Sequence, residues 1–375
     1  MANVSSSNGL EKRPKLRFPG FDEPWSIYKA EELFKNVADK NHPMETVLTI
    51  IQGKGTLPRE QAGRNIHYDD SSLANYKKVE QGDFIIHLRS FEGGLEMANE
   101  DGIVSPAYTI LRCKKPHSSL FYEAYFHTDE FINHILSKSV EGIRDGRQIS
   151  YEAFKWLGLP YCDVSEQERI AQLFCTLSHG IEKQQQMVDA LKKYKRGLIK
   201  LVFEKVMSEA HYQLPLSDLC ISISSGRTTV NESNGRYPLF GSTGIVGMTN
   251  TIEHDGDIVM VARVGANAGK VNFFSGRCGV TDNTLVIRVK ENTIHPKFLA
   301  YFLENFDLHK LIFGSGQPLV TGGQLKKIQS PVIAYKAQLL ITRSLESLDR
   351  IIGTQDTYME KLIQLKSGLM QRLFI

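Results

Sequence analysis

Cysteine is scarce and irregularly spaced in this chain of 375 residues. The five cysteines are Cys113, Cys162, Cys175, Cys220 and Cys278. They include no Cys-x-x-Cys pair, which is the spacing that a zinc ribbon or a thioredoxin-like motif requires. An odd number of widely separated cysteines is typical of reduced thiols. The pattern therefore predicts a cytoplasmic protein without structural zinc or a disulfide framework.

Long hydrophobic runs are also missing. No stretch approaches the roughly 20 uninterrupted apolar residues of a membrane-spanning helix. The polar opening MANVSSSNGLEKRPK lacks the apolar run that follows the charges of a secretory signal. We expect no contact with a membrane, and a flexible tail over residues 1–15.

The chain carries no large excess of charge of either sign. Its 45 Lys and Arg residues against 42 Asp and Glu residues give a net charge of only +3. With 41% hydrophobic and 23% charged residues, the composition is that of an ordinary globular protein, long enough for two or three domains. A surface that binds nucleic acid would have to arise from the placement of basic residues rather than from their number.

Recognisable catalytic motifs are missing as well. The chain has no Pro-Pro pair for the Asn/Asp-Pro-Pro-aromatic motif of amino-methyltransferases, no Pro-Asp that could open a nuclease centre, and no His-x-x-x-His pair. In GANAGK (265–270) only three residues separate the glycine from Gly-Lys, where a phosphate-binding loop needs four, so we expect a turn there. The sequence does not exclude a Ser-His-Asp triad, but it contains no nucleophile-elbow motif that would indicate one. We expect no catalytic residues, no metal ion and no cofactor.

An internal repeat organises the sequence. Residues 191–203 read LKKYKRGLIKLVF and residues 362–374 read LIQLKSGLMQRLF, so that matching residues such as Gly197 and Gly368 lie 171 positions apart. In both copies, mainly apolar residues recur at alternating steps of four and three, a heptad seam typical of coiled-coil helices. The seam residues are Ile170, Phe174, Leu177, Ile181, Gln184, Val188, Leu191 and Leu198 in the first copy, and Ile341, Leu345, Leu348, Ile352, Gln355, Met359, Leu362 and Leu369 in the second.

The two seams predict long helices over residues 165–208 and 336–375. The simplest interpretation is that they pack on each other as an antiparallel coiled coil, with the polar seam residues fixing the register. The alternative is two amphipathic helices that each cover their own domain. A helix of 33 residues would be about 50 Å long.

The segments before the two helices also resemble each other. GDFII (82–86) and GDIVM (256–260) each predict a turn followed by a strand, and SPAYTIL and TDNTLVI follow further along. We therefore predict an α/β (α+β) fold with a pseudo-two-fold internal repeat. Two similar globular domains, at residues 16–164 and 209–335, would each precede one long helix.

This layout resembles the specificity subunit of Type I restriction-modification enzymes. Three segments are similar to stretches of such subunits: LRFPGFDEPW (16–25), SSGRTTVNESNGRYPLFGSTGIVG (224–247) and SGQPLVTGGQLKKIQSPV (315–332). The resemblance implies that each globular domain is a target-recognition domain that reads one half of a bipartite site in double-stranded DNA. It also implies that the helices set the spacer and dock two methyltransferase (modification) subunits, and that restriction (nuclease and translocase) subunits join the complex.

Candidate DNA contacts are basic, hydroxyl and amide side chains in predicted loops, because Arg or Lys can address guanine and Gln can address adenine. In the second domain they are Arg227, Thr228, Thr229, Arg263, Gln317, Lys326 and Lys327. In the first domain, which has no visible counterpart of the Ser-Gly-Arg-Thr-Thr segment, they are Lys54, Arg59, Arg64, Arg89 and Arg147. Each of these residues alone also fits an ordinary solvated surface.

Two other functions stay open at this point. The chain could be a self-sufficient DNA methyltransferase or nuclease with a divergent active site, although the missing motifs argue against it. It could also be a coiled-coil scaffold protein, although the duplicated, strand-rich domains with their Arg, Thr and Gln loops favour the reading of DNA.

Overall fold

A computed structural model describes residues 14–62, 70–142, 147–229, 232, 234–312 and 318–374. The chain divides into two compact units. Unit 1 comprises Met1–Gln184 with Tyr358–Ile375, and unit 2 comprises Gln185–Thr357. Each unit contains one globule and a part of each long helix, α5 (Val164–Glu209) and α9 (Tyr335–Leu373).

The globule of unit 1 is built on a four-stranded antiparallel sheet. Its strands follow the order β2 (Phe34–Val37), β9 (Thr109–Cys113), β6 (Phe84–Ile86) and β7 (Glu96–Met97). Four two-stranded pairs surround it: β1 (Ser26–Lys29) with β12 (Gly158–Tyr161), β3 (Leu48–Ile51) with β4 (Gly55–Pro58), β5 (Lys77–Val79) with β8 (Gly102–Val104), and β10 (Val140–Glu141) with β11 (Gln148–Ile149). The short helices are α1 (Ala30–Leu33), α2 (Ser90–Gly93), α3 (Ser119–Phe126) and α4 (Tyr151–Phe154).

The globule of unit 2 repeats this plan and extends it. Its four-stranded antiparallel sheet has the order β14 (Cys220–Ser225), β20 (Thr284–Val289), β17 (Asp257–Ala262) and β18 (Val271–Ser275). A second sheet contains β16 (Gly244–Thr249), β15 (Tyr237–Gly241) and β19 (Gly279–Val280), and β13 (Gln213–Pro215) pairs with β21 (Gln329–Pro331). The helices are α6 (Leu216–Leu219), α7 (Pro296–Phe306) and α8 (Gly322–Lys326).

The two globules therefore share one strand order, β2-β9-β6-β7 in unit 1 and β14-β20-β17-β18 in unit 2. The predicted strands in GDFII and GDIVM become β6 and β17, which are inner strands of their sheets. Both carry continuous buried apolar runs, as expected of strands covered on both faces. The predicted fold of two similar α/β globules with long helices is confirmed.

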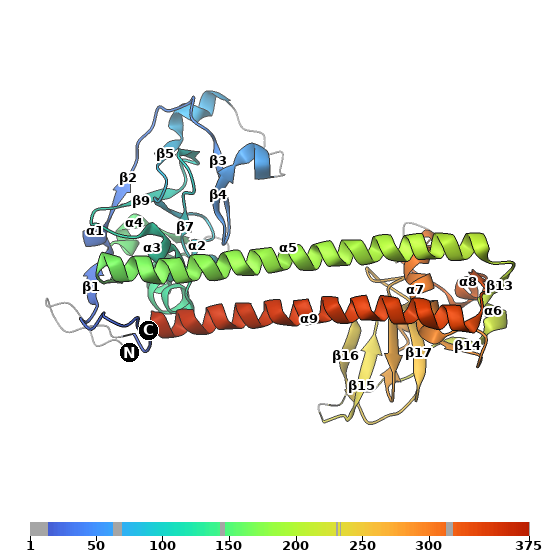
Figure 1. The fold of residues 1–375 in the computed structure, drawn as a ribbon. Helices are drawn as coiled ribbons and strands as arrows, with labels where there is room; N and C mark the ends of the chain where they lie inside the picture. The colour runs from blue at the N-terminus through green and yellow to red at the C-terminus, as the bar shows by residue number, and fades with distance from the viewer. Residues whose placement is uncertain are drawn as a thin grey trace. The chain divides into compact units, whose positions relative to one another are not determined.

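Within unit 1, α5 and α9 pack against each other in opposite directions (Figure 1). The ring of Phe174 stacks on that of Phe374, with centroids 5.7 Å apart. Further along α5, Ser178 Oγ accepts a hydrogen bond of 2.7 Å from Lys366 Nζ. The partner number falls as the α5 number rises, so the two helices are antiparallel.

Within unit 2, the same two helices are held by ion pairs. Lys192 Nζ lies 3.1 Å from a carboxylate oxygen of Asp356, and Lys195 Nζ lies 2.9 Å from one of Asp349. The order of these partners again gives an antiparallel pair.

Every predicted seam residue lies in α5 or α9 and is buried or half-buried. Ile170, Phe174, Gln184, Val188, Leu345, Leu348 and Ile352 are buried. Leu177, Ile181, Leu191, Leu198, Ile341, Gln355, Met359, Leu362 and Leu369 are half-buried. An apolar face of this kind stabilises a long helix mainly through packing rather than through helix propensity.

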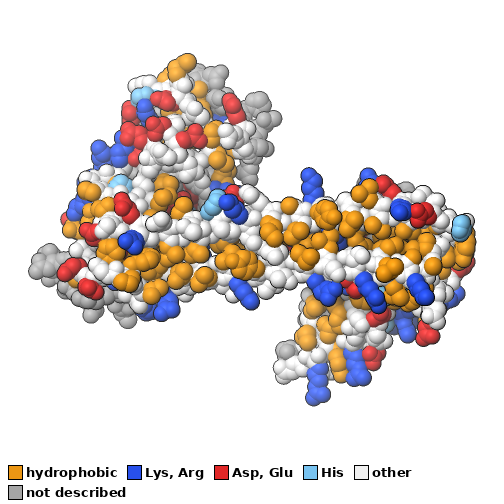
Figure 2. Space-filling model, in the orientation of Figure 1, with side chains coloured by type: hydrophobic (Ala, Val, Ile, Leu, Met, Phe, Trp, Pro, Cys, Tyr) orange, Lys and Arg blue, Asp and Glu red, His pale blue; other side chains and the backbone are white. Residues whose placement is uncertain are grey.

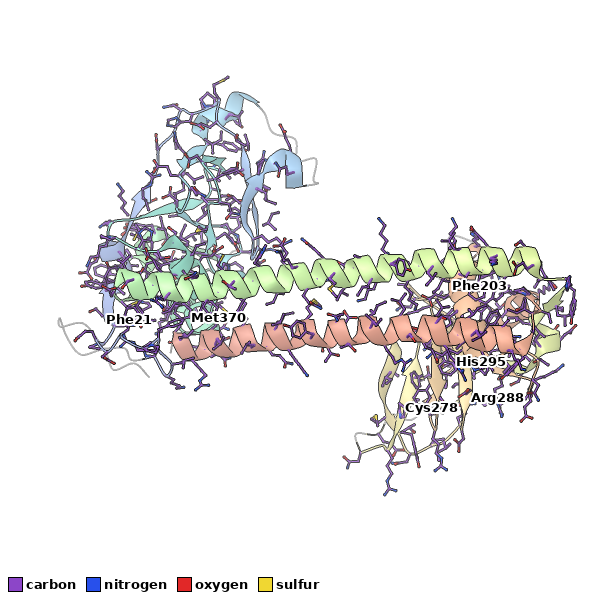
Figure 3. The ribbon with its side chains drawn as sticks, viewed as in Figure 1. Phe21, Phe203, Cys278, Arg288, His295 and Met370 are labelled. Atoms are coloured by element: carbon purple, nitrogen blue, oxygen red, sulfur yellow. The ribbon has the colours of Figure 1, made fainter. Side chains whose placement is uncertain are left out.

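Each long helix ends in the core of a globule. In unit 2 the ring of Phe203 (Figure 3) packs against Phe298 and Phe302 of α7. In unit 1 its repeat equivalent, Phe374, packs against Phe121 and Tyr125 of α3. Both phenylalanines are fully buried, and such burial stabilises by roughly 1.5–3 kcal/mol per side chain.

A buried glutamine ties each globule to its helix. The side chain of Gln167 accepts a 3.0 Å hydrogen bond from the backbone N–H of Ser118 and donates to the carbonyl oxygen of Cys162. One repeat later, Gln338 accepts a 2.8 Å hydrogen bond from the N–H of His295 and also donates to a carbonyl five residues earlier. Because buried polar groups are costly unless bonded, these glutamines fix the approach of α3 and α7 to the long helices.

Along the described stretches, no helix is both long enough and apolar enough to cross a bilayer.

Candidate nucleic-acid interface

The loop that follows β14 in unit 2 presents two of the candidate residues to solvent. Arg227 and Thr229 are exposed, whereas Thr228 between them is only 5% exposed. The N–H of Thr228 donates to the carbonyl oxygen of Val280 at 2.8 Å, and its hydroxyl donates to a carboxylate oxygen of Glu253 at 2.7 Å. Thr228 therefore anchors the loop rather than offering its hydroxyl to a ligand.

The carboxylate of Glu253 organises this loop. It accepts hydrogen bonds from the backbone N–H of Arg227 at 2.9 Å, of Thr228 at 3.1 Å and of Val280 at 3.4 Å. Burial raises the pKa of Glu253, but the Thr228 hydroxyl, these N–H groups and the nearby His254 outweigh burial, so the pKa lies below the usual value for glutamate. The carboxylate is thus ionised at neutral pH.

The surface beside this loop combines apolar and basic side chains. Val280 lies in β19, which pairs with β15, and β15 pairs with β16. Ile245 and Val246 of β16 are exposed, as is Arg236 just before β15. Figure 2 shows Lys and Arg side chains over this part of unit 2.

In unit 1 the turn between β3 and β4 presents Lys54. Its neighbours Gly53 and Gly55 have φ of +74° and +75°, a left-handed conformation that favours glycine. Glu96 accepts a 2.7 Å hydrogen bond from the N–H of Gly53 and a 2.9 Å one from the N–H of Gly55. The side-chain amide of Asn99 donates to the carbonyl oxygen of Lys54 at 2.7 Å. The turn is therefore fixed while the Lys54 side chain is exposed.

Glu96 is fully buried and lies 3.3 Å from Nε2 of His127. Burial raises the pKa of Glu96, but hydrogen bonds from His127 and the two glycines outweigh it and hold the pKa below its usual value. Burial lowers the pKa of His127, yet its hydrogen bond with Glu96 leaves that pKa raised. Glu96 is therefore ionised beneath the Lys54 turn, and its contact with His127 favours the protonated imidazole.

The remaining candidates are Arg59, Arg64, Arg89, Arg147, Arg263, Gln317, Lys326 and Lys327. Arg64 and Gln317 lie outside the described residues. Arg89, Arg147, Lys326 and Lys327 are exposed, and Arg59 and Arg263 are half-buried. The Arg147 guanidinium lies over the Phe91 ring, 4.3 Å from its centroid. Among the described members of this group, Lys326 and Lys327 are neighbours at the end of α8, and Arg89 and Arg147 both lie beside α2.

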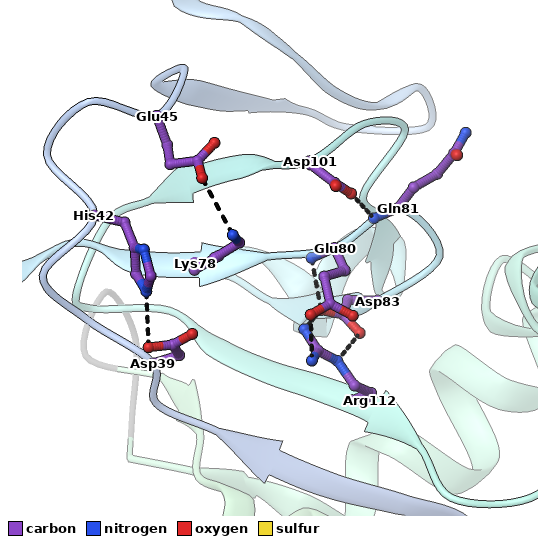
Figure 4. A network of polar contacts seen from close by, with 9 residues as sticks. All are labelled: Asp39, His42, Glu45, Lys78, Glu80, Gln81, Asp83, Asp101 and Arg112. Carbon is purple, nitrogen blue, oxygen red and sulfur yellow. Dashed lines mark hydrogen bonds and ion pairs between the residues drawn. The ribbon is translucent and has the colours of Figure 1, made fainter.

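Other basic residues of unit 1 are engaged with carboxylates (Figure 4). Arg112 of β9 makes two hydrogen bonds to Asp83, of 2.9 and 2.7 Å, and one of 2.7 Å to Glu80. Lys78 of β5 pairs with Glu45 at 3.1 Å. This network stabilises the sheet, and its neutralised charges add little to a phosphate-binding surface.

No described cluster of three or more His, Cys, Asp or Glu residues could hold a metal ion. Burial raises the pKa of the Cys220 and Cys278 thiols to about 11, so both stay protonated at neutral pH and are poor nucleophiles.

The long helices carry a second set of exposed hydrophobic side chains outside the seam. In α5, Met187, Tyr194 and Leu201 are 45%, 62% and 65% exposed, and in α9, Tyr358 and Leu365 are 53% and 51% exposed. Within each helix they are spaced by seven residues and so share one face. We call these five residues the outer stripe. Met187 of unit 2 and Tyr358 of unit 1 are repeat equivalents, as are Tyr194 of unit 2 and Leu365 of unit 1.

Residues 213–362 match the family model described as the Type I restriction modification DNA specificity domain. Among curated proteins, the chain is similar to the Type I restriction enzyme EcoprrI specificity subunit of Escherichia coli, with 28% identity over 33% of this chain and 30% of that protein. It is also similar to the Type I restriction enzyme MjaVIII specificity subunit of Methanocaldococcus jannaschii, with 28% identity over 38% of this chain and 36% of that protein. The matches thus span about a third of each relative.

Among solved structures, the chain resembles the S subunit of a Type I restriction-modification system from M. genitalium. The TM-score is 0.64 with 13% sequence identity, and the match covers 96% of this chain and 99% of that one. Similarity at this identity concerns the fold, and it extends over both globules and both long helices.

Proposed function

Since the chain belongs to the family of Type I restriction-modification specificity subunits, we propose that it is the DNA-reading, non-catalytic subunit of such a complex in the cytoplasm. The target-recognition domains are residues 16–164 and 209–335, and each reads one half of a bipartite site in double-stranded DNA. The observation that carries this proposal is the repeat of one α/β globule, with the same strand order and the same attachment to a long helix.

The exposed basic turns are the parts of the globules best suited to this task. Arg227 and Lys54 each stand on a turn with a fixed backbone and an exposed side chain. Either side chain can address guanine in the major groove, and a good bidentate contact contributes about 1–3 kcal/mol of discrimination. The other exposed basic candidates would contact phosphates, which position the protein without reading sequence.

The long helices set the spacer between the half-sites and dock the partner subunits. The outer stripe supports docking, because exposed hydrophobic side chains that recur on one helix face mark a surface for protein contact. Since the stripe contains repeat-equivalent pairs, it supports two equivalent docking sites and hence two methyltransferase subunits. Restriction subunits would join the assembly through these partners.

The proposal is tested by methyl transfer with and without a partner. The purified chain alone should neither bind S-adenosylmethionine nor methylate DNA. Mixed with its cognate methyltransferase subunit, it should form a complex with two of those subunits that methylates one bipartite sequence. Methylation by the isolated chain would favour a self-sufficient enzyme, and a complex with no sequence preference would favour a scaffold.

A further inference from the structure

We propose that Glu253 in unit 2 and Glu96 in unit 1 are positioning residues for DNA recognition. Each carboxylate holds the backbone of the turn that carries one exposed basic side chain, and thereby aims that side chain at its half-site. This inference rests on the proposed function and deepens it, because it names residues that determine specificity without contacting DNA.

In unit 2 the carboxylate of Glu253 binds the backbone on both sides of the Cα atom of Arg227. Glu253 accepts from the N–H of Arg227 and from the N–H of the next residue, Thr228. These hydrogen bonds are donated by backbone N–H groups, so they fix the backbone of Arg227 and leave its side chain exposed. The N–H donors of the guanidinium therefore stay available for a ligand. The bonds to Val280 and to the Thr228 hydroxyl tie the same carboxylate to β19. The orientation of Arg227 therefore depends on one side chain that follows 26 residues later.

In unit 1 the same relationship recurs around Lys54. The N–H groups of Gly53 and Gly55, one on each side of Lys54, both donate to Glu96. A Cβ atom on Gly55 would lie 2.5 Å from the carbonyl oxygen of Met97, so the turn is held tightly against the strand that contains Glu96. The backbone that carries the exposed Lys54 side chain is thus also fixed by a carboxylate, that of Glu96.

The two carboxylates are not counterparts in the internal repeat. Glu96 begins β7, whereas Glu253 lies between β16 and β17. Both units therefore reach the same arrangement from different elements, which duplication of one ancestral sequence does not explain. A common requirement, a rigid turn beneath an exposed basic side chain, does explain it.

Stability alone is a poor reason for these two carboxylates, of which Glu96 is fully buried and Glu253 is half-buried. Withdrawing a carboxylate from water is costly, and an apolar residue of similar volume often serves stability equally well. Asp83 differs, because it pairs with the Arg112 guanidinium, and the one backbone N–H that its carboxylate accepts, from Glu80, belongs to a turn without a basic side chain. The charges of Glu96 and Glu253 are instead directed largely at N–H groups of turns, where they fix the conformation of those turns. Preorganised contacts of this kind raise specificity because less freedom is lost on binding.

The test uses the complete complex with the methyltransferase subunit, comparing Glu253→Gln and Glu96→Gln with the wild type. Glutamine keeps the shape but sets an NH₂ group against N–H donors, which should release the turn. Methylation rates are measured on duplexes with single base-pair changes in either half-site. Glu253→Gln should lower discrimination roughly 10-fold in the half-site read by unit 2. Discrimination in the other half-site should stay within about twofold. Glu96→Gln should show the reverse pattern.

Three control variants separate the outcomes. Asp83→Asn removes a buried carboxylate of unit 1 that does not bind a turn with an exposed basic side chain. It should lower the melting temperature without a selective loss of discrimination at one half-site. Arg227→Ala and Lys54→Ala should reproduce the defects of Glu253→Gln and Glu96→Gln. If a Gln variant does not fold, the corresponding Asp variant, which keeps the charge but shortens its reach, should give a weaker defect of the same pattern.

The inference is overturned if Arg227→Ala loses half-site discrimination while Glu253→Gln and Glu253→Asp keep it, and in that case the proposed function still stands. It is also overturned if Arg227→Ala and Lys54→Ala leave both half-sites unchanged. A wild-type complex that methylates without sequence preference would instead remove the proposed function.

Discussion

The Nζ atom of Lys195 lies 2.9 Å from Oδ1 of Asp349, where α5 and α9 meet within unit 2. In unit 1 the repeat equivalents of Lys195 and Asp349 are Lys366 and Ser178. Lys366 Nζ donates a 2.7 Å hydrogen bond to Ser178 Oγ. Burial lowers the pKa of Lys366, and no carboxylate partner of the helix pair offsets this. The equivalent lysines of the antiparallel helices thus form an ion pair with a carboxylate in unit 2 and a hydrogen bond with a hydroxyl group in unit 1.

This difference predicts that Ser178→Asp adds the missing ion pair to unit 1. The substitution should raise the pKa of Lys366 and increase the free energy of unfolding by up to about 1 kcal/mol, because the pair is only partly buried. The matched variant Asp349→Ser should lower stability, since Lys195 loses a partner. Both are measured by urea denaturation of the chain. Unchanged unfolding in both variants would show that these lysines do not hold the helices together.

The shared anchoring of the helices predicts equal effects at equivalent positions. Phe203→Ala and Phe374→Ala should each lower the free energy of unfolding by about 3–5 kcal/mol, because both rings are fully buried among aromatic residues. The control Leu201→Ala, at a side chain that is 65% exposed, should change it by no more than about 0.5 kcal/mol. Calorimetry of the three variants provides the comparison. A large loss in only one of the two phenylalanine variants would contradict an equivalent role in both units.

The pair of Glu96 and His127 predicts a pH dependence of stability. The pKa of His127 is raised by Glu96, with Glu123 acting in the same direction, and His87 is a further titratable neighbour whose own pKa burial lowers. The charged form of His127 therefore stabilises the fold below its unfolded pKa of about 6.5, and this contribution is lost as the pH rises through the raised folded value. The stability difference between the wild type and His127→Gln should be larger near pH 6 than near pH 8.5, as measured by denaturant titration. A difference that does not change with pH would contradict the ionised pair.

The outer stripe predicts which surface holds the methyltransferase subunits. Tyr194→Lys and Leu365→Lys should leave the melting temperature nearly unchanged, because both side chains are more than half exposed. Each variant should weaken docking of one methyltransferase subunit, and the double variant should weaken docking of both. Mass measurement of the reconstituted complex gives the stoichiometry, with the exposed Lys193→Ala as control. Full two-to-one complexes with the double variant would place docking elsewhere.

The elements predicted correctly from the sequence are those in which apolar residues recur at a regular spacing. The heptad seam locates α5 and α9, and the paired Gly-Asp turns locate β6 and β17, because burial imposes a regular spacing of apolar residues. The same repeat offset relates Gln167 to Gln338, which lie one turn before the first residue of each heptad seam, so the seam pattern does not include them. Extending the comparison by a few residues would have found this pair.

The site was predicted less completely. Thr228 was a candidate for contact with DNA, but its side chain points inward to Glu253, and no sequence pattern gives the direction of a loop side chain. Glu96 and Glu253 were missed altogether. They act on backbone N–H groups, which every residue except proline carries, so their partners leave no signature in the sequence.

In the proposed function, each globule reads its own half of the target while the helices set the spacer. The most direct test replaces residues 215–330 with the corresponding segment of a related specificity subunit, and sequences the methylome of cells that carry the chimaera and its methyltransferase subunit. We predict that one half of the methylated sequence changes, while the other half and the spacer length stay as they were. A chimaera that methylates actively but has changed both halves, or neither, would contradict the account.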